Sequence, residues 1–345
     1  MTDSSRSEGA ASGEAPLGEA AIIAGFLAPL AAGFPGAMGL TDDCAFLTPA
    51  PGEEIVLKTD AVAEGIHFRS TDDPADIGWK ALAVAVSDLA AKGARPLVYL
   101  MALSFPQMPA RDWLAGLSAG LSQAQTRFGL HLAGGDTDKR PGPVTVTITV
   151  LGAVPTGRRV VRAAARPGDT ILVSGTLGDS ALGLKLLQEP ALASEWGLTT
   201  QEAAHLAGRY LRPEPRIGLR AAILDEARAA MDLSDGLAKD LGRLCLASGV
   251  AGIIDVDRLP LSSAARKAVV ADPELLAAVF AGGDDYEILA TVAPESADLF
   301  IAAAASAGIA VTVIGHIGDG SGVRFLATDG SELALSATGW DHFGG

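Results

Sequence analysis

Six short segments of the sequence place aspartate beside a hydroxyl residue, a second aspartate or a pair of glycines. Carboxylate and hydroxyl oxygens are ligands that Mg²⁺ prefers, and Mg²⁺ often joins such ligands to substrate phosphates. Segments of this kind could therefore hold phosphate through bound cations. Any one of them could equally be a turn or a helix cap, but six in one chain favour a metal–phosphate site. They span residues 41–43, 58–60, 87–88, 134–137, 232–236 and 282–285.

Two glycine-containing segments, at residues 134–136 and 175–179, are interpreted as small-residue loops where the backbone could approach a phosphate. Neither has the GxxxxGK[ST] spacing of a Walker A loop or the GxGxxG spacing of a dinucleotide loop. The sequence also lacks the HRD and DFG pair of protein kinases. A nucleotide-using enzyme with this sequence would belong to neither common class, and each loop alone is more often a tight turn.

The first half of the chain predicts a mixture of strands and helices that would carry these segments. Four apolar residues between 76 and 91 share one helical face, and residues 144–150 alternate Val or Ile with Thr as a half-exposed strand does. We expect helices over residues 18–32, 76–91 and 109–128, and strands over residues 46–48, 54–58, 97–105 and 144–150.

The second half repeats this alternation after a Gly-, Pro- and Arg-rich stretch at residues 152–168, where we place a domain boundary. Strands are expected near residues 171–175, 229–233, 251–256, 286–292 and 310–317, and helices over 179–188, from about 234, and over 294–307. Strands alternating with helices in both halves predict an α/β (α+β) protein of two mixed domains. The predicted units are a tail at 1–16, an N-terminal domain at 17–155 and a C-terminal domain at 156–345.

Composition limits the function classes. With 49% hydrophobic residues among 345, the chain can form a packed core and is not disordered overall. Its 26 basic and 41 acidic residues give a net charge of −15, which disfavours nucleic acid and anionic membranes as partners. The same charge repels a polyphosphate unless cations mediate the contact. The two cysteines, Cys44 and Cys245, allow no disulfide framework and no zinc pattern.

The N-terminal residues lack the basic and apolar regions of an export signal, and the apolar run at 20–32 is too short to span a bilayer. We therefore expect a cytoplasmic protein.

Ten segments in order resemble the thiamine-monophosphate kinase family, from about residue 18 to residue 343. The combination of SDLAAKGA, DLSDGL and GGDDYE is specific to that family. Each one alone indicates only a wider superfamily of ATP-dependent enzymes, which includes aminoimidazole ribotide synthetase and selenophosphate synthetase. The matching segments are TDDCAFL (41–47), KTDAVAEGIHF (58–68), DIGWKALAVAVSDLAAKGARP (76–96), GGDT (134–137), RPGDTILVSGTLGDSALGL (166–184), RPEPRIGLR (212–220), MDLSDGLAKDLGRL (231–244), LPLS (259–262), GGDDYEI (282–288) and GWDHF (339–343).

The resemblance implies an enzyme that moves the γ-phosphoryl group of ATP onto thiamine monophosphate, giving thiamine diphosphate and ADP. It implies direct in-line transfer assisted by several Mg²⁺ ions. It also implies the aminoimidazole ribotide synthetase-like fold, with the N-terminal domains pairing through their sheets into a homodimer.

The resemblance also assigns roles by motif position. The implied metal ligands are Asp43, Lys58 through its backbone carbonyl, Thr59, Asp60, Asp88, Asp136, Asp232 and Asp235. The implied ATP contacts are Gly135, Asp136, Arg162 and Ser234, and the implied contacts to the thiamine substrate are His67, Asp284 and Trp340. The residues expected to act in catalysis are Asp60, Asp88, Asp136, Arg162 and Asp235.

Elementary chemistry agrees with these roles. A phosphate acceptor is already anionic, so it needs little help from a general base. The barrier lies in bringing two anions together, and cations together with an arginine such as Arg162 can lower it. The sequence offers no convincing activated Ser, Cys or His nucleophile, and this reaction requires none.

Several of these residues also have a purely structural interpretation. Asp235 could cap a helix over 236–247, and Asp232 could be a strand-end turn residue. His67 could be a half-buried histidine, Trp340 a core anchor, and Arg162 one member of a basic loop that also contains Arg158, Arg159 and Arg166.

The sequence departs from the family pattern at four positions. Lys58 stands where the family often has Ser or Thr, and its ammonium would repel or replace a metal ion. Asp284 replaces a more frequent Glu and is one methylene shorter, Ala85 replaces a common Asn, and Thr41 a Gly.

Two alternatives remain open. One is another ATP-dependent synthetase of the superfamily. Among these, a selenophosphate synthetase would need a reactive Cys near the N-terminus, where the first 43 residues have none. The other is a catalytically inactive nucleotide-binding relative, which the ammonium of Lys58 favours and the retained aspartates oppose.

Overall fold

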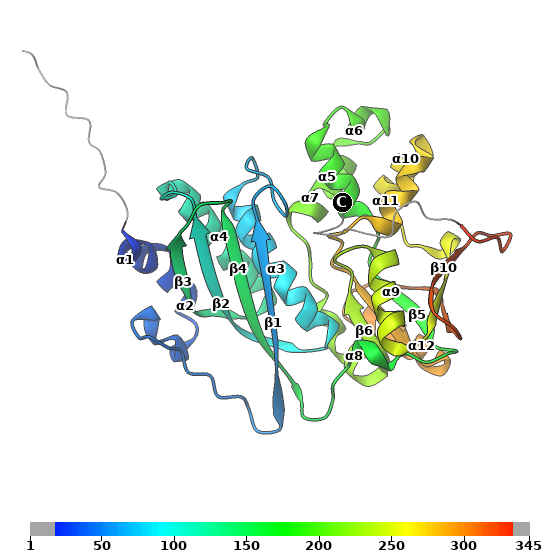
Figure 1. Ribbon diagram of the computed structural model, residues 1–345, viewed down its shortest axis with the longest axis horizontal. Coiled ribbons are helices and arrows are strands. Elements are labelled where there is room, and N and C mark those ends of the chain that lie inside the picture. The colour runs from blue at the N-terminus through cyan, green and yellow to red at the C-terminus, as the bar shows by residue number, and fades with distance from the viewer. Residues whose placement is uncertain (1–17, 334–345) are drawn as a thin grey trace, which may run out of the picture.

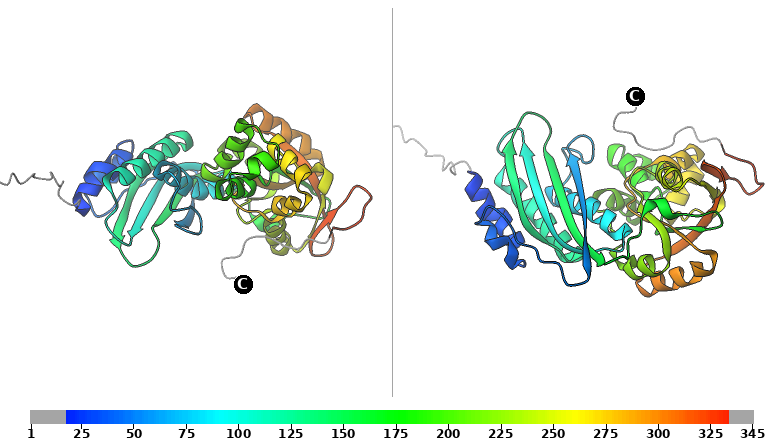
Figure 2. Two further views of the ribbon diagram at one scale, coloured as in Figure 1. Left: turned by 90° about the horizontal axis from the view of Figure 1, so that it is seen from above. Right: turned by 60° about the horizontal axis from the view of Figure 1, so that its bottom comes forward.

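The computed structural model describes residues 18–333, which form two units, each built on its own sheet (Figures 1 and 2). The tail expected at 1–16 and the candidate substrate residue Trp340 lie outside the described residues. Two mixed sheets with helices packed against them confirm the predicted fold class.

The N-terminal unit is a four-stranded sheet in the order β1-β4-β2-β3. Its strands β1 and β2 are each antiparallel to β4, whereas β2 and β3 are parallel. Helices α3 and α4 lie on one face of this sheet (Figure 2). The bounds are β1 Glu53–Ala63, α3 Pro74–Ala91, β2 Arg95–Phe105, α4 Arg111–Phe128, β3 His131–Lys139 and β4 Thr145–Pro155.

Helix α3 is the central element of the molecule. Asp73 begins it, since its side chain accepts a hydrogen bond from the N–H of Ala75 at 2.8 Å and Pro74 occupies the first turn. Almost every residue from Ile77 to Ala91 is buried. A helix that is apolar all round must be covered all round, and α3 contacts both the N-terminal sheet and strand β6 of the second unit.

The N-terminal helix expected over 18–32 is confirmed as three consecutive helical segments: α1 (Glu19–Ile22), the π-helical η1 (Ile23–Leu27) and α2 (Ala28–Ala31). A 3₁₀ segment, η2 (Pro35–Leu40), follows. The strand expected at 46–48 is wrong. The N–H of Phe46 donates to the carbonyl of Gly36 at 2.9 Å instead of to a neighbouring strand, and the Phe46 side chain is exposed.

The C-terminal unit is a six-stranded sheet in the order β10-β7-β9-β5-β8-β6, in which only β10 and β7 are parallel neighbours. Its strands are β5 Thr170–Ser174, β6 Ala227–Asp232, β7 Ala251–Asp255, β8 Ile288–Val292, β9 Val311–Gly318 and β10 Gly322–Leu326.

The helices of this unit are more numerous than the apolar patterns predicted. The helix expected over 179–188 is confirmed, and the one expected from about residue 234 begins at Leu237. The helices are α5 Asp179–Gln188, α6 Leu192–Glu195, α7 Thr200–Leu211, α8 Arg220–Glu226, α9 Leu237–Ser248, α10 Ser263–Ala271, α11 Leu276–Ala281 and α12 Ala297–Ser306, with 3₁₀ turns η3 Arg162–Ala164, η4 Ile217–Leu219, η5 Val256–Arg258, η6 Pro273–Leu275 and η7 Pro294–Ser296.

Two candidate segments occupy strands rather than the loops or strand ends expected of them. Residues 58–60 lie in the middle of β1, and residues 134–136 lie within β3. The glycines of β3 allow a close approach to β2, because a Cβ atom at Gly135 would stand 1.9 Å from the carbonyl oxygen of Met101.

Helices α3 and α4 also touch at a glycine, which gives a stability prediction. A Cβ atom at Gly120 would lie 1.9 Å from the carbonyl oxygen of Ala75, so we expect Gly120→Ala to destabilise the protein by about 1–3 kcal/mol. Gly208 in α7 is the matched control, because nothing stands within 4 Å of its missing Cβ. Gly208→Ala should stabilise by about 0.5–1 kcal/mol. Urea unfolding of both variants checks the opposite signs, and equal shifts would contradict the prediction.

Candidate functional site

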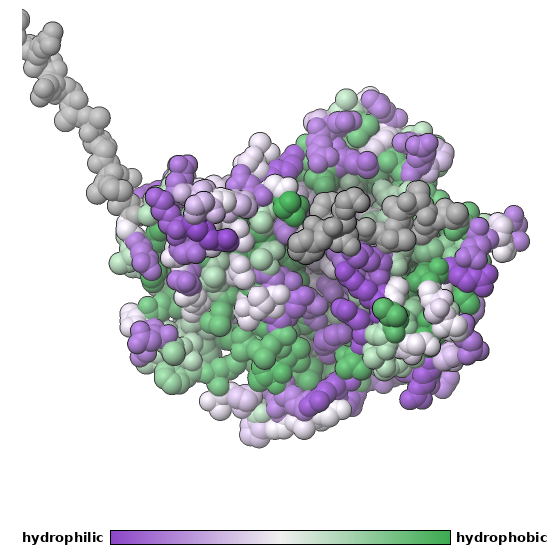
Figure 3. Space-filling model, viewed as in Figure 1, coloured by the Kyte–Doolittle hydropathy of each residue, from purple (hydrophilic) through white to green (hydrophobic). Residues whose placement is uncertain are grey.

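A cleft of about 800 Å³ lies between the two units. Strand β1 and helix α3 supply its N-terminal wall, and helix α5, the end of β6 and the loop at 282–286 supply the other. Hydrophilic side chains gather where the two units meet (Figure 3). Eight of the residues singled out from sequence line this cleft: Lys58, Asp60, His67, Asp88, Asp232, Ser234, Asp235 and Asp284.

The ammonium of Lys58 lies between two carboxylates. Its Nζ is 3.0 Å from Asp60 Oδ1 and 2.7 Å from Asp88 Oδ2. Burial alone would lower the pKa of Lys58, but the charges and hydrogen bonds of Asp88 and Asp60 outweigh it and raise the pKa above its ordinary value. Lys58 is therefore a fixed cation at the position where the sequence raised the question of a metal ion.

Asp232 brings a third carboxylate to this group from the C-terminal unit. It is buried, and burial together with the negative charge of Asp88 raises its pKa to about 7. Asp60, Asp88 and Asp232 carry three potential negative charges against the one positive charge of Lys58. Within residues 18–333, no three His, Cys, Asp or Glu side chains are arranged as a ready-made metal site. Around Lys58 the three carboxylates therefore outnumber the one ammonium.

Asp240, a residue that the sequence analysis did not select, holds the loop after β6 in place through hydrogen bonds. The Asp240 carboxylate accepts hydrogen bonds from the N–H groups of Ser234 at 3.0 Å and Asp235 at 2.8 Å. Asp235 does not cap α9, since the capping position is Gly236, at φ +104°. Its carboxylate pairs with Arg243 at 2.6 Å.

His67 follows β1 in a turn at the cleft wall. Its Nδ1 accepts a hydrogen bond from the N–H of Ala63 at 3.0 Å, so the neutral ring carries its proton on Nε2. The hydroxyl of Tyr210 donates to the backbone carbonyl of His67 at 3.2 Å. The turn is therefore tied to helix α7 of the second unit.

Comparison with known proteins identifies the family. Two domain families match: AIR synthase related protein, N-terminal domain, over residues 41–154, and AIR synthase related protein, C-terminal domain, over residues 166–327. The thiamine-monophosphate kinase of Caulobacter vibrioides is 38% identical over 97% of this chain and 94% of its own length. This chain belongs to the thiamine-monophosphate kinase family.

Solved structures of thiamine-monophosphate kinases agree in fold. The enzyme from Stenotrophomonas maltophilia superposes with a TM-score of 0.77 at 39% identity, covering 85% of this chain and 91% of that one. AaThiL complexed with AMPPCP and TMP gives a TM-score of 0.74 at 32% identity, covering 88% and 91%.

Several residues to which the resemblance to thiamine-monophosphate kinases gives a metal-binding or ATP-binding role do not line the cleft of this chain. Thr59 points to the opposite face of the sheet from Lys58 and Asp60, because side chains alternate along a strand, and its hydroxyl bonds that of Thr149 at 2.8 Å. Gly135 and Asp136 are on β3, at the opposite edge of the sheet from β1 and about 14 Å away across three strand spacings.

Asp43 and Arg162 also stand outside the residues that line the cleft. Asp43 precedes β1, and Arg162 begins the 3₁₀ turn η3 after the N-terminal sheet. The roles that the thiamine-monophosphate kinase resemblance gives to these residues remain predictions.

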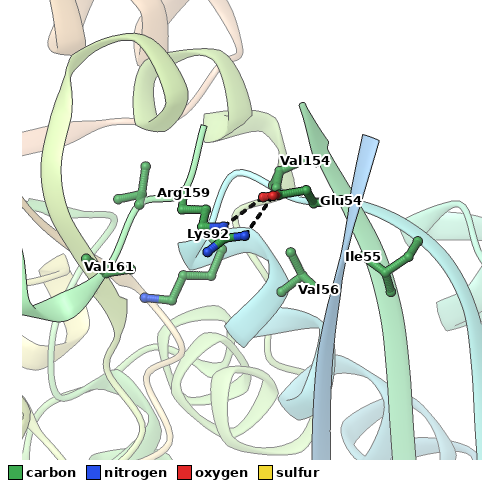
Figure 4. A pocket seen from close by; sticks show the side chains of 8 residues that line it. Glu54, Ile55, Val56, Lys92, Val154, Arg159 and Val161 are labelled. Carbon is green, nitrogen blue, oxygen red and sulfur yellow. Dashed lines mark hydrogen bonds and ion pairs between the residues drawn. The ribbon is translucent and has the colours of Figure 1, made fainter. Parts of the chain in front are cut away.

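A smaller cavity of about 490 Å³ lies beside the first residues of β1 and contains Lys92 (Figure 4). Lys92 donates a hydrogen bond to the carbonyl of Ala230, on the outer strand β6, at 2.5 Å. Burial and the charge of Arg162 lower the pKa of Lys92 to about 8. At the rim of the cavity Arg159 forms two hydrogen bonds with Glu54, at 2.7 and 2.8 Å. Lys92 thus joins the end of α3 to the sheet of the second unit.

No helix within residues 18–333 has both the length and the apolar character needed to cross a membrane.

Proposed function

We propose that this protein transfers the γ-phosphoryl group of ATP to thiamine monophosphate, giving thiamine diphosphate and ADP. The observation that carries the proposal is the cleft in which Asp60 and Asp88 from one unit meet Asp232 from the other. Membership of the thiamine-monophosphate kinase family and the relative complexed with AMPPCP and TMP give the two substrates.

The donor set of the cleft fits Mg²⁺. Asp60, Asp88 and Asp232 offer hard oxygen ligands, and Asp232 is a buried carboxyl group whose pKa is raised by its burial and by the negative charge of Asp88. Mg²⁺ usually takes only one or two protein carboxylates and completes its shell with water and substrate phosphates. We propose that these three residues and Asp235 hold the ions, joined by Asp43, Thr59, Asp136 and the carbonyl of Lys58 as the resemblance implies. Bound Mg²⁺ would neutralise the phosphates.

The chain itself would position the two substrates in line. Ser234, on the loop braced by Asp240, would contact ATP together with Gly135, Asp136 and Arg162. His67, Asp284 and Trp340 would contact the thiamine substrate. An in-line transfer between two phosphates depends on orientation and charge neutralisation more than on proton transfer. The absence of a nucleophile–base pair from the proposed roles is consistent with that chemistry.

We propose further that the protein is a homodimer paired through the helix-free face of the N-terminal sheet. This face carries exposed Leu57 and Leu100, which are 67% and 41% accessible, and apolar side chains cover much of the lower left of Figure 3. Exposed apolar surface of this kind often marks an interface. Thr59 and Asp136 project from the same face by the strand register, so pairing would enclose them.

The proposed activity is tested by measuring ADP released from ATP with thiamine monophosphate and Mg²⁺, with thiamine diphosphate identified by chromatography. Product that disappears when EDTA is added supports the proposal. ATP bound without turnover would overturn it and favour the inactive nucleotide-binding alternative, for which the position of Lys58 between two carboxylates is the supporting observation. ADP release with a different acceptor would indicate another synthetase.

Lys58 gives a prediction for metal affinity. Lys58→Met removes the ammonium that neutralises Asp60 and Asp88, so the cleft gains one net negative charge. We expect the Mg²⁺ concentration that gives half-maximal ADP release to fall about tenfold, corresponding to about 1.4 kcal/mol. Lys267→Met, which removes only an exposed pair with Glu202, is the control. A higher Mg²⁺ requirement in Lys58→Met would show that the ammonium assists the site.

A further inference from the structure

Lys80 is a buried lysine behind the wall of the cleft. It lies on α3, only 3% of its surface is accessible, and its Nζ is 2.8 Å from Oδ2 of Asp284. The other carboxylate oxygen of Asp284 accepts a hydrogen bond from the hydroxyl of Tyr286 at 3.0 Å. Both oxygens of Asp284 are therefore held by donors of the chain, one of them charged.

The same ammonium also fixes an aromatic ring of the cleft. Lys80 Nζ stands 3.5 Å from the ring centroid of Tyr210, the distance of a cation–π contact. Tyr210 lines the cleft, and its hydroxyl reaches the carbonyl of His67. Lys80 thus connects three elements of the proposed thiamine end: Asp284, Tyr210 and, through Tyr210, the turn that carries His67.

The backbone around Asp284 is held in an uncommon conformation. Asp284 has φ +68° and Tyr286 φ +49°, a region that residues other than glycine rarely adopt. The N–H of Asp284 donates to the carbonyl of Ser234 at 2.9 Å, and the N–H of Tyr286 to that of Leu233 at 2.8 Å. Strained residues persist where the surroundings fix them, and they cluster at ligand sites.

We propose that Lys80 is a positioning residue that fixes Asp284 and Tyr210 for recognition of the acceptor substrate. The Lys80–Asp284 pair is neutral overall, so it offers a stationary hydrogen-bond acceptor beside an aromatic ring rather than a net charge. That combination suits an amino-substituted heteroaromatic ring, whose N–H groups can donate and whose face can pack on tyrosine. The inference rests on the proposed function, which supplies thiamine monophosphate as the ligand.

The test compares Lys80→Met with Lys80→Arg. Lys80→Met keeps the length and apolar stem but removes the charged donor, and we expect the KM for thiamine monophosphate to rise about tenfold with the KM for ATP unchanged. Lys80→Arg keeps a charged donor and should recover part of the loss. Equal changes in both KM values, or no change in either, would overturn the inference.

A double substitution separates a positioning role from a general loss of structure. If Lys80 acts through Asp284, adding Lys80→Met to Asp284→Asn should not raise the KM for thiamine monophosphate further. Additive effects would overturn the proposal. If the wild type binds thiamine monophosphate in calorimetry but forms no product, the proposed function fails. The inference is then tested by binding alone, which Lys80→Met should weaken and Lys80→Arg retain, and a wild type that does not bind it would overturn both.

Discussion

Asp232→Asn is expected to lower the rate of thiamine diphosphate formation by about a hundredfold to a thousandfold, the effect of losing one preorganised electrostatic group in an active site. Asparagine keeps the size of the side chain and one oxygen but removes the negative charge. Asp232 belongs to the C-terminal unit, and the negative charge of Asp88 in the N-terminal unit contributes to its raised pKa. Steady-state turnover at saturating ATP and thiamine monophosphate is the measurement.

Asp298→Asn is the matched control for this substitution, because Asp298 is an exposed residue of α12 remote from the cleft residues. It should retain full activity. A direct titration with Mn²⁺ in place of Mg²⁺ should show weaker binding in Asp232→Asn only. Retention of more than a tenth of the wild-type turnover by Asp232→Asn would remove Asp232 from the proposed metal site.

Glu287→Ala is expected to destabilise the protein by about 3–5 kcal/mol, the cost of removing one partner from a buried ion pair. Glu287 is fully buried and pairs with two arginines. Its Oε1 lies 2.8 Å from Nη2 of Arg209, and its Oε2 lies 2.7 Å from Nε of Arg216. It also accepts a hydrogen bond from the Ser174 hydroxyl at 2.6 Å. Without the carboxylate, two guanidinium groups would face each other in the interior. Urea unfolding measures the loss.

Two further variants show whether charge is the cause. Glu287→Gln keeps the shape and an acceptor oxygen, so it should lose less stability than Glu287→Ala but still leave the arginines without a counter-charge. Glu295→Ala removes an exposed carboxylate and should change the unfolding midpoint very little. Equal stability of Glu287→Ala and the wild type would show that the arginines find other partners.

Apolar periodicity predicted most of the elements that carry the cleft. The run from Ile77 to Ala91 indicated α3, and the alternation at residues 144–150 indicated β4. The spacing of apolar residues shows these elements because it reflects which of their faces are buried. It predicted only the first part of β1, as the strand over 54–58, because the polar residues Lys58 and Asp60 interrupt the apolar pattern, and it missed β3, which two glycines interrupt. The short apolar segment at residues 46–48 suggested a strand, but within residues 18–333 no strand pairs with this segment.

The carboxylates of the cleft could be chosen from the sequence, since aspartate beside serine, threonine or glycine is a local pattern. Their supports could not. Lys80 and Asp284 are 204 residues apart, and only the docking of α3 against the second unit makes them neighbours. In the sequence Asp240 resembles any carboxylate on a helix, and only the folded structure brings it to the backbone of Ser234 and Asp235. Because the predicted strand ended at residue 58, the sequence also did not predict that Thr59 and Asp60 project from opposite faces of one sheet.

The hydrogen bond from Lys92 to Ala230 has a consequence for the order in which activity and sheet structure are lost on heating. Asp88 lies one helical turn before Lys92, and Asp232 lies two residues after Ala230, so this single contact helps to set the spacing of the two carboxylates. Local opening requires less free energy than unfolding a whole sheet. Activity should therefore disappear at a lower temperature than the circular dichroism of the sheets, and the width of that interval reports how firmly the two halves are docked.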